Sequence, residues 1–183
     1  EYNGIKIFKS DGYKLPDALE EEIEAIILDE ARVPPIKVGG EVGKVTRAQY
    51  ALSDYIGHII STTNLRFDGM KVALDCANGS ACVTAKELFT TLGAECHIVS
   101  AEPDGVNIND RCGSTHLEQL QAYTVEQGCD IGLAFDGDAD RLLVIDEKGG
   151  LIDGDKIIAI CALDMKRRGQ LAKDAAVVTV MSN

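Results

Sequence analysis

The chain has 183 residues, a length typical of one large domain or of one and a half ordinary ones. Its 30 acidic and 18 basic residues give a formal net charge of −12, which argues against binding to nucleic acid or to anionic membranes, because both need basic patches. The sequence has no apolar run long enough for a membrane span and no opening signal peptide, while 45% of its residues are apolar, enough for a buried core.

The six cysteines show neither a C-x-x-C pair nor the spacing of a zinc site. This pattern predicts free thiols, several of them buried, in the reducing environment of the cytoplasm. The cysteines are Cys76, Cys82, Cys96, Cys112, Cys129 and Cys161.

The chain opens with an expected strand at residues 5–8, followed by an expected helix over residues 16–32. Pro16 suits the first turn of that helix, and the acidic residues that follow it suit the positive end of the helix dipole. Apolar residues at helical spacing give the helix one apolar face, and the run Val33-Pro34-Pro35 ends it.

An irregular connection is expected over residues 36–45, which are rich in Gly and Val. Thr46 and Gln49 have the spacing of a capping box, which predicts that a second helix begins there and continues to about residue 61. Polar residues then break the pattern, so we place a domain boundary near residue 66.

From residue 70 onward, strands and helices alternate, which predicts a three-layer α/β/α domain with a mostly parallel sheet. The helix after the fourth strand is apolar nearly all round and is therefore expected to be well buried. The predicted order is strand 72–74, a helix capped by Ser80, strand 96–99, a helix capped by Thr115, strands 131–135 and 142–145, helix 156–168, and strand 175–181.

Three aspartates lie between the third and fourth of these strands, in the sequence DGDADR. Asp136, Asp138 and Asp140 are spaced two residues apart, so an extended chain can point all three carboxylates to one side. Like charges that lie so close repel each other unless a cation sits among them, and carboxylate oxygens suit Mg²⁺. Arg141 follows at once with a guanidinium fork that suits phosphate.

Other interpretations of this loop compete with the metal site. Asp and Gly are common turn residues, so a DGD turn needs no metal. An EF-hand loop would have its bidentate Glu at Glu147, but it needs Gly where Arg141 stands, so this alternative is rejected. A phosphatase that uses Asp136 as its nucleophile stays open.

Several further stretches accompany the loop, and together they resemble the α-D-phosphohexomutase superfamily over nearly the whole chain. DGDADR and NGIK mark the superfamily, whereas the PDGVNIND and CGSTH run favours its branch that acts on glucosamine phosphates. The stretches are NGIKIF at Asn3–Phe8, ALDCANGSA around Asp75–Ala81, PDGVNIND at Pro103–Asp110, CGSTH at Cys112–His116, and DGDADR with LIDGD behind it.

The resemblance implies a phosphosugar substrate and the interconversion of glucosamine 6-phosphate and glucosamine 1-phosphate through a phosphoserine and a bisphosphorylated sugar. It implies that Asp136, Asp138 and Asp140 hold Mg²⁺ and that Arg141 supports the phosphate. Lys6 would be an acid/base or charge-stabilising group near the phosphoserine. Residues 1–66 would be the C-terminal part of domain 1 with a linker helix, and residues 67–183 would be domain 2.

The sequence also departs from the superfamily. It contains no Ser-His-Asn-Pro motif for the phosphoserine, nor the sugar-recognition and phosphate-clamping loops of domains 3 and 4. We therefore expect a fragment that is inactive on its own. Another phosphohexomutase, acting on mannose or glucose phosphates, and a non-catalytic metal-binding module remain alternatives; sugar specificity and oligomeric state are not predicted.

Overall fold

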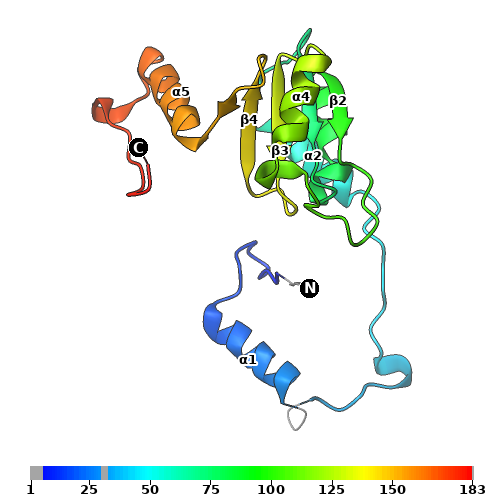
Figure 1. Cartoon of the computed structure of the whole chain (residues 1–183). Helices are drawn as coiled ribbons and strands as arrows, with labels where there is room; N and C mark the ends of the chain where they lie inside the picture. Colours follow the sequence, from blue (N-terminus) through cyan, green and yellow to red (C-terminus); the bar gives the residue numbers. More distant parts are fainter. Residues whose placement is uncertain (1–5, 30–32, 183) are drawn as a thin grey trace. The chain divides into compact units, whose positions relative to one another are not determined.

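The computed structural model describes residues 6–29 and 33–182, which belong to two compact units, Glu1–Arg47 and Ala48–Asn183 (Figure 1). In the first unit, helix α1 spans Asp17–Leu28 and a short 3₁₀ turn spans Gly39–Glu41. The helix expected over residues 16–32 is thus confirmed from Asp17 to Leu28, with Pro16 at the N-cap position, but it ends earlier than expected, because Asp29 is already extended. Residues 30–32 lie outside the described part.

The strand expected at residues 5–8 does not form within the described residues. Ile5 lies outside them, and Phe8 makes only an isolated antiparallel bridge with Lys14. An isolated pair of short strands is only marginally stable, because it needs a third strand or a packed hydrophobic face to hold it.

The second unit begins with helix α2, Ala51–Ser61, five residues after Thr46. The capping box predicted at Thr46 and Gln49 is therefore wrong, since Tyr50 is the N-cap residue and none of the described side chains caps this helix. The predicted caps at Ser80 and Thr115 are also wrong. The 3₁₀ turn Ser80–Val83 precedes helix α3 (Ala85–Thr91), and the 3₁₀ turn Gly113–Thr115 precedes helix α4 (Glu118–Glu126).

Five strands form one sheet in the order β2-β1-β3-β4-β5. β1 pairs in parallel with both β2 and β3, whereas β3–β4 and β4–β5 are antiparallel. The α/β class is confirmed, but the sheet is mixed rather than mostly parallel, because the short loop after β3 lets the chain return only as a hairpin. The strands are β1 Lys71–Asp75, β2 Glu95–Val99, β3 Ile131–Phe135, β4 Leu142–Asp146 and β5 Leu151–Ile152.

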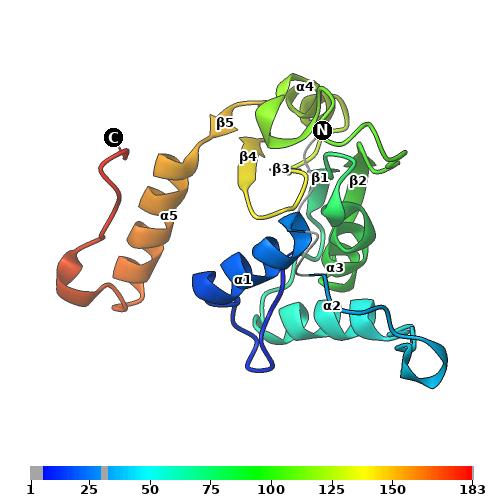
Figure 2. The ribbon, with the colours of Figure 1, turned by 90° about the horizontal axis from the view of Figure 1, so that it is seen from below.

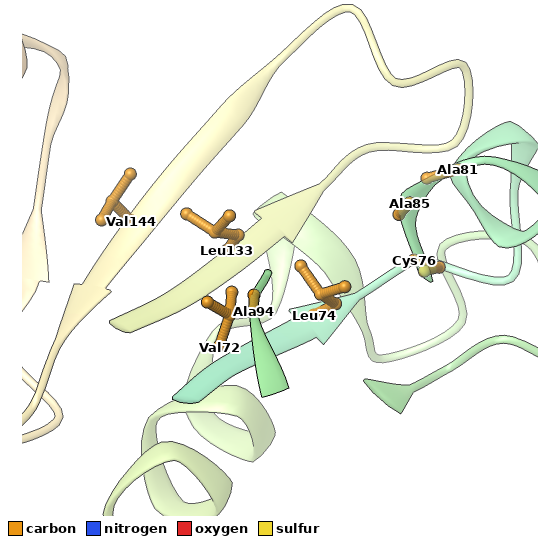
Figure 3. Packing of buried hydrophobic residues seen from close by; sticks show 8 residues of the cluster. All are labelled: Val72, Leu74, Cys76, Ala81, Ala85, Ala94, Leu133 and Val144. Carbon is orange, nitrogen blue, oxygen red and sulfur yellow. The ribbon is translucent and has the colours of Figure 1, made fainter. Parts of the chain in front are cut away.

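Helices α3 and α4 cover opposite faces of this sheet, which gives the expected three layers (Figure 2). Side chains alternate between the two faces along each strand. Val72, Leu74 and Leu133 face α3, in the cluster shown in Figure 3, whereas Ala73 and Ile145 face α4 with Leu120. Packing in these two clusters holds β3 and β4, and the DGDADR loop projects from the end of the sheet where these two strands are joined.

The C-terminal segment differs from the expectations. Helix α5, Gly154–Arg167, is capped by Asp153, whose carboxylate accepts a hydrogen bond from the Lys156 amide at 2.9 Å. None of the residues of α5, all of them described, is buried. Within the described residues 175–182 no strand forms, and Val177 and Val180 are fully exposed. An apolar helix or a β-branched run is buried only where another surface covers it, and the described residues supply none here.

Across the described ranges, the structure has no helix that is both long enough and apolar enough to cross a bilayer. All six cysteines, which belong to the described part of the chain, are free thiols.

The thiols should differ widely in their reactivity toward iodoacetamide. Cys76 is 1% exposed, and its burial raises the pKa of the thiol to about 12, so almost no thiolate is present at pH 8. Cys161 is exposed on α5. We expect Cys161 to be alkylated first and Cys76 only after unfolding in urea, as measured by peptide mass spectrometry over time. Alkylation of Cys76 in the folded chain at the rate of Cys161 would contradict this part of the fold.

Candidate metal centre

The DGDADR loop joins β3 to β4 at one edge of the sheet. Because β1, β2 and β3 run in parallel, the carboxyl ends of all three strands lie at this same edge. Ligand sites of α/β proteins are typically found in this position. The predicted metal loop is thus placed where the fold favours a site.

The three predicted metal ligands lie together. One carboxylate oxygen from each of Asp136, Asp138 and Asp140 can be chosen so that all three atoms lie within 4.8 Å of one another. Asp136 is buried, at 9% exposure, and the other two are exposed. Three hard oxygen donors at this spacing, open to water on one side, fit a small divalent cation such as Mg²⁺.

The backbone of the loop folds around Asp136. The amide of Arg141 donates a hydrogen bond to Asp136 Oδ1 at 2.9 Å, and the amide of Ala139 donates to the Asp136 carbonyl at 3.0 Å. Ala139 takes the left-handed conformation, with φ of 58°, which turns the chain back toward β4. Burial of Asp136 raises its pKa, but the hydrogen bonds, that from the Arg141 amide foremost, lower it more, so the net pKa falls below the usual value. The carboxylate is therefore ionised at neutral pH.

The Arg141 guanidinium lies beside two of the carboxylates. Its Nε atom is 3.6 Å from Asp136 Oδ2 and 3.6 Å from Asp140 Oδ1, and its side chain is 79% exposed. Ion pairs this exposed contribute little to stability, so the side chain can turn to another anion without much loss. Its predicted contact with phosphate stays a prediction.

Lys6, the other predicted catalytic residue, belongs to the first compact unit, where it is exposed. Its role as an acid/base or charge-stabilising group stays a prediction.

Gly137, between the first two metal-ligand candidates, is in close contact with the turn after β1. The Ser80 amide donates a hydrogen bond to the Gly137 carbonyl at 2.9 Å. A Cβ atom at Gly79 would lie 2.2 Å from that carbonyl oxygen, so only glycine fits there. This contact joins residues far apart in the sequence, so the local sequence pattern gives no signal of it.

The polar loop over residues 101–113 is held by side chains that hydrogen-bond to its backbone. Asn78 Oδ1 accepts from the Glu102 amide at 3.1 Å, and Asn107 Nδ2 donates to the Glu102 carbonyl at 2.9 Å. The loop borders a polar groove of about 420 Å³ at the carboxyl ends of β1 and β2. Residues lining the groove include Asn78, Ser100, Glu102, Asn107, Asp110 and Cys112.

Comparison with known proteins agrees with this architecture. Residues 53–150 match the model of the phosphoglucomutase/phosphomannomutase alpha/beta/alpha domain II. The chain is 51% identical to the phosphoglucosamine mutase of Acetivibrio thermocellus and 54% identical to that of Clostridium acetobutylicum, in each case over 183 residues. Each alignment covers 100% of this chain and 41% of the relative. The chain thus spans about two fifths of the length of the curated relatives it matches.

Solved structures show the same fold. A phosphoglucomutase/phosphomannomutase family protein from Burkholderia thailandensis is 27% identical, with a TM-score of 0.63 over 84% of this chain and 32% of that one. A putative phosphomannomutase from Thermus thermophilus, 22% identical, has a TM-score of 0.56 over 82% of this chain and 35% of that one. The resemblance to the phosphohexomutases is therefore confirmed, and the chain belongs to the phosphoglucomutase/phosphomannomutase family through its alpha/beta/alpha domain II.

Proposed function

We propose that the chain is the metal-binding part of a cytoplasmic phosphoglucosamine mutase. The parent enzyme interconverts glucosamine 6-phosphate and glucosamine 1-phosphate through a phosphoserine and a bisphosphorylated sugar. The observation that carries this proposal is the identity of 51% and 54%, over all 183 residues, to two proteins of that name. In domain terms, residues 1–66 are the end of domain 1 and its linker helix, and residues 67–183 are domain 2.

The site supplies the charges that phosphoryl transfer needs. Asp136, Asp138 and Asp140 hold Mg²⁺, which when bound spreads the negative charge of the transferring phosphoryl group. Arg141, exposed beside them, supports the phosphate with its guanidinium fork. Lys6 is an acid/base or charge-stabilising group. Asp136 stays ionised through its hydrogen bond from the Arg141 amide, so it is ready to bind a cation at neutral pH.

The proposal is tested by a chimeric enzyme. The matching 183-residue segment of the Clostridium acetobutylicum phosphoglucosamine mutase is replaced by this chain, and turnover of glucosamine 6-phosphate is compared with that of the parent. Because the two segments are 54% identical, we expect activity within about tenfold of the parent and a requirement for Mg²⁺. The chain alone is expected to show no mutase activity.

The alternatives give different results in the same assays. The sugar-recognition loop lies outside this chain, so the host of the chimera sets its sugar preference. A chimera that is inactive in the phosphoglucosamine mutase but active when the same segment is placed in a phosphomannomutase would assign the chain to another phosphohexomutase. Folded chimeras with no turnover in either host would contradict the mutase proposal and favour a metal-binding module. Hydrolysis of phosphate esters by the chain alone, abolished by Asp136→Asn, would favour the phosphatase alternative.

A further inference from the structure

We propose that Asp75 is a positioning residue for the metal loop. It would act through a loop cradle, which we define as residues 75–80 after β1 together with residues 107–113. The proposal rests on the proposed metal site, since it explains how the carboxylates of that site are held in place. Asp75 lies outside the DGDADR loop and is not one of the predicted ligands.

Asp75 is the last residue of β1 and is completely buried. Its Oδ1 atom accepts a hydrogen bond from the Ala77 amide at 2.9 Å, and its Oδ2 atom accepts one from the Gly113 amide at 2.8 Å. The two oxygens thus hold the two halves of the loop cradle. Oδ1 holds the turn after β1, and Oδ2 holds Gly113, which lies 38 residues after Asp75 in the chain. Burying a carboxylate costs free energy unless such hydrogen bonds compensate it. Asp75 and the two backbone amides therefore hold one another in position.

Both halves of the cradle are also joined to each other and to the end of β3. The Asn109 amide donates a hydrogen bond to the Ala77 carbonyl at 2.9 Å. Gly113 lies so close to β3 that a Cβ atom there would be 2.5 Å from the carbonyl oxygen of Phe135. Phe135 directly precedes Asp136, so Gly113, held by Asp75, packs against the residue from which the metal loop starts.

Gly137, on the other side of Asp136, is held between the two halves of the cradle. From one half, the Ser80 amide donates a hydrogen bond to its carbonyl. From the other half, Ile108 Cδ1 and Asn109 Nδ2 lie 2.7 and 2.8 Å from the position that a Cβ atom at Gly137 would take. The backbone from Phe135 to Gly137 is therefore fixed on both sides, and this backbone sets where the Asp136 carboxylate stands relative to Asp138 and Asp140.

Partners outside the ligand set typically change metal affinity about 10- to 100-fold when they are altered, because they orient the ligands. The first experiment is therefore a Mn²⁺ titration of the 183-residue chain and of Asp75→Asn, followed by electron paramagnetic resonance of free Mn²⁺. The amide keeps the size of the side chain but replaces one acceptor oxygen with a donor. We expect the affinity for Mn²⁺ to fall about tenfold or more.

The chain offers a matched control in Asp146→Asn. Asp146 Oδ1 also accepts two backbone hydrogen bonds, from the amides of Lys148 at 2.9 Å and Gly150 at 2.6 Å. It lies at the far end of β4, opposite Ile131 at the start of β3 and thus at the other edge of the sheet. We expect Asp146→Asn to lower thermal stability and to leave Mn²⁺ affinity within about twofold of wild type. Equal loss of affinity in both variants, or none in a folded Asp75→Asn, would overturn the positioning role.

A second readout works without metal and separates this proposal from the proposed function. The amide signals of Gly137 and Asp138 in nuclear magnetic resonance spectra of the metal-free chain should shift in Asp75→Asn and stay in place in Asp146→Asn. If the wild-type chain binds no Mn²⁺, the proposed metal site fails, and shifted amide signals still support positioning of the loop by Asp75. Unshifted signals in Asp75→Asn would overturn the positioning role whether or not Mn²⁺ binds.

If Asp75→Asn does not fold, Gly79→Ala, in the same half of the cradle, decides. Its Cβ atom would lie 2.2 Å from the carbonyl oxygen of Gly137, a backbone contact that no side-chain rotation relieves, so Mn²⁺ binding should weaken about tenfold. Gly57→Ala, whose Cβ atom would meet no described atom within 4 Å, should keep the affinity of the wild-type chain. Full affinity in a folded Gly79→Ala, or equal loss in Gly57→Ala, would overturn the proposal that the cradle positions the loop.

Discussion

Asp136→Asn should lower the Mn²⁺ affinity of the chain by about 100-fold or more, beyond the typical effect of a residue outside the ligand set. Asp136 is the buried member of the three carboxylates, and the hydrogen bond from the Arg141 amide holds its Oδ1 atom in place. Asn keeps the shape of the side chain but removes the negative charge, and hard cations bind neutral amide oxygens much more weakly than a charged pair of oxygens. Isothermal titration with MnCl₂ measures the difference.

The control for this variant is Asp130→Asn, the same chemical change at the other edge of the sheet. Asp130 Oδ2 accepts a hydrogen bond from the amide of Lys71 at 2.8 Å, at the amino end of β1. The affinity of the Asp130→Asn chain for Mn²⁺ should equal that of the wild-type chain. Retained affinity in Asp136→Asn, or equal loss in Asp130→Asn, would show that the three aspartates do not form the site.

Gly79→Ala should destabilise the chain by about 1–3 kcal/mol, the typical cost of forcing extra atoms into a packed region. The added Cβ atom would lie 2.2 Å from the Gly137 carbonyl oxygen and 2.7 Å from its Cα atom. Both atoms belong to the backbone, so no side-chain rotation relieves the contact and the metal loop itself must move. We therefore also expect weaker Mn²⁺ binding. Urea unfolding followed by circular dichroism measures the loss of stability.

Gly57→Ala is the matched control, because a Cβ atom there would meet no described atom within 4 Å. Gly57 lies inside helix α2, where alanine is favoured over glycine by about 0.5–1 kcal/mol. We expect a higher urea midpoint in Gly57→Ala and a lower one in Gly79→Ala. A Gly79→Ala chain as stable as the wild type would contradict the close packing of the turn after β1 against the metal loop.

The sequence predicts those features of the fold and the site that depend on local patterns. Apolar runs bounded by turn residues correctly place β1, β2, β3 and β4, because a buried strand can be recognised from the apolar pattern of about five neighbouring residues. The grouping of Asp136, Asp138 and Asp140 is predictable too, since all three lie in one short loop between strands. Their roles in binding metal remain a proposal.

Features that depend on distant partners are not predictable in this way. Asp75 looks like the end of a strand, and its hydrogen bond to Gly113 joins residues far apart in the sequence. The antiparallel return of β4 depends on the length of a loop rather than on any residue within it. The predictions that α5 is buried and that residues 175–181 form a strand were wrong. Apolar composition indicates that a segment would be stabilised by packing against another surface, but it does not show which surface that is.

Locating the metal tests the proposed metal centre most directly. Crystals of the 183-residue chain soaked in MnCl₂ should show an anomalous difference peak between the carboxylates of Asp136, Asp138 and Asp140, with oxygen ligands at about 2.0–2.2 Å. Asp136→Asn crystals soaked in the same way should lack this peak. Wild-type crystals with an ordered DGDADR loop and no manganese there, or with manganese bound only elsewhere, would contradict the assignment of this loop as the metal centre.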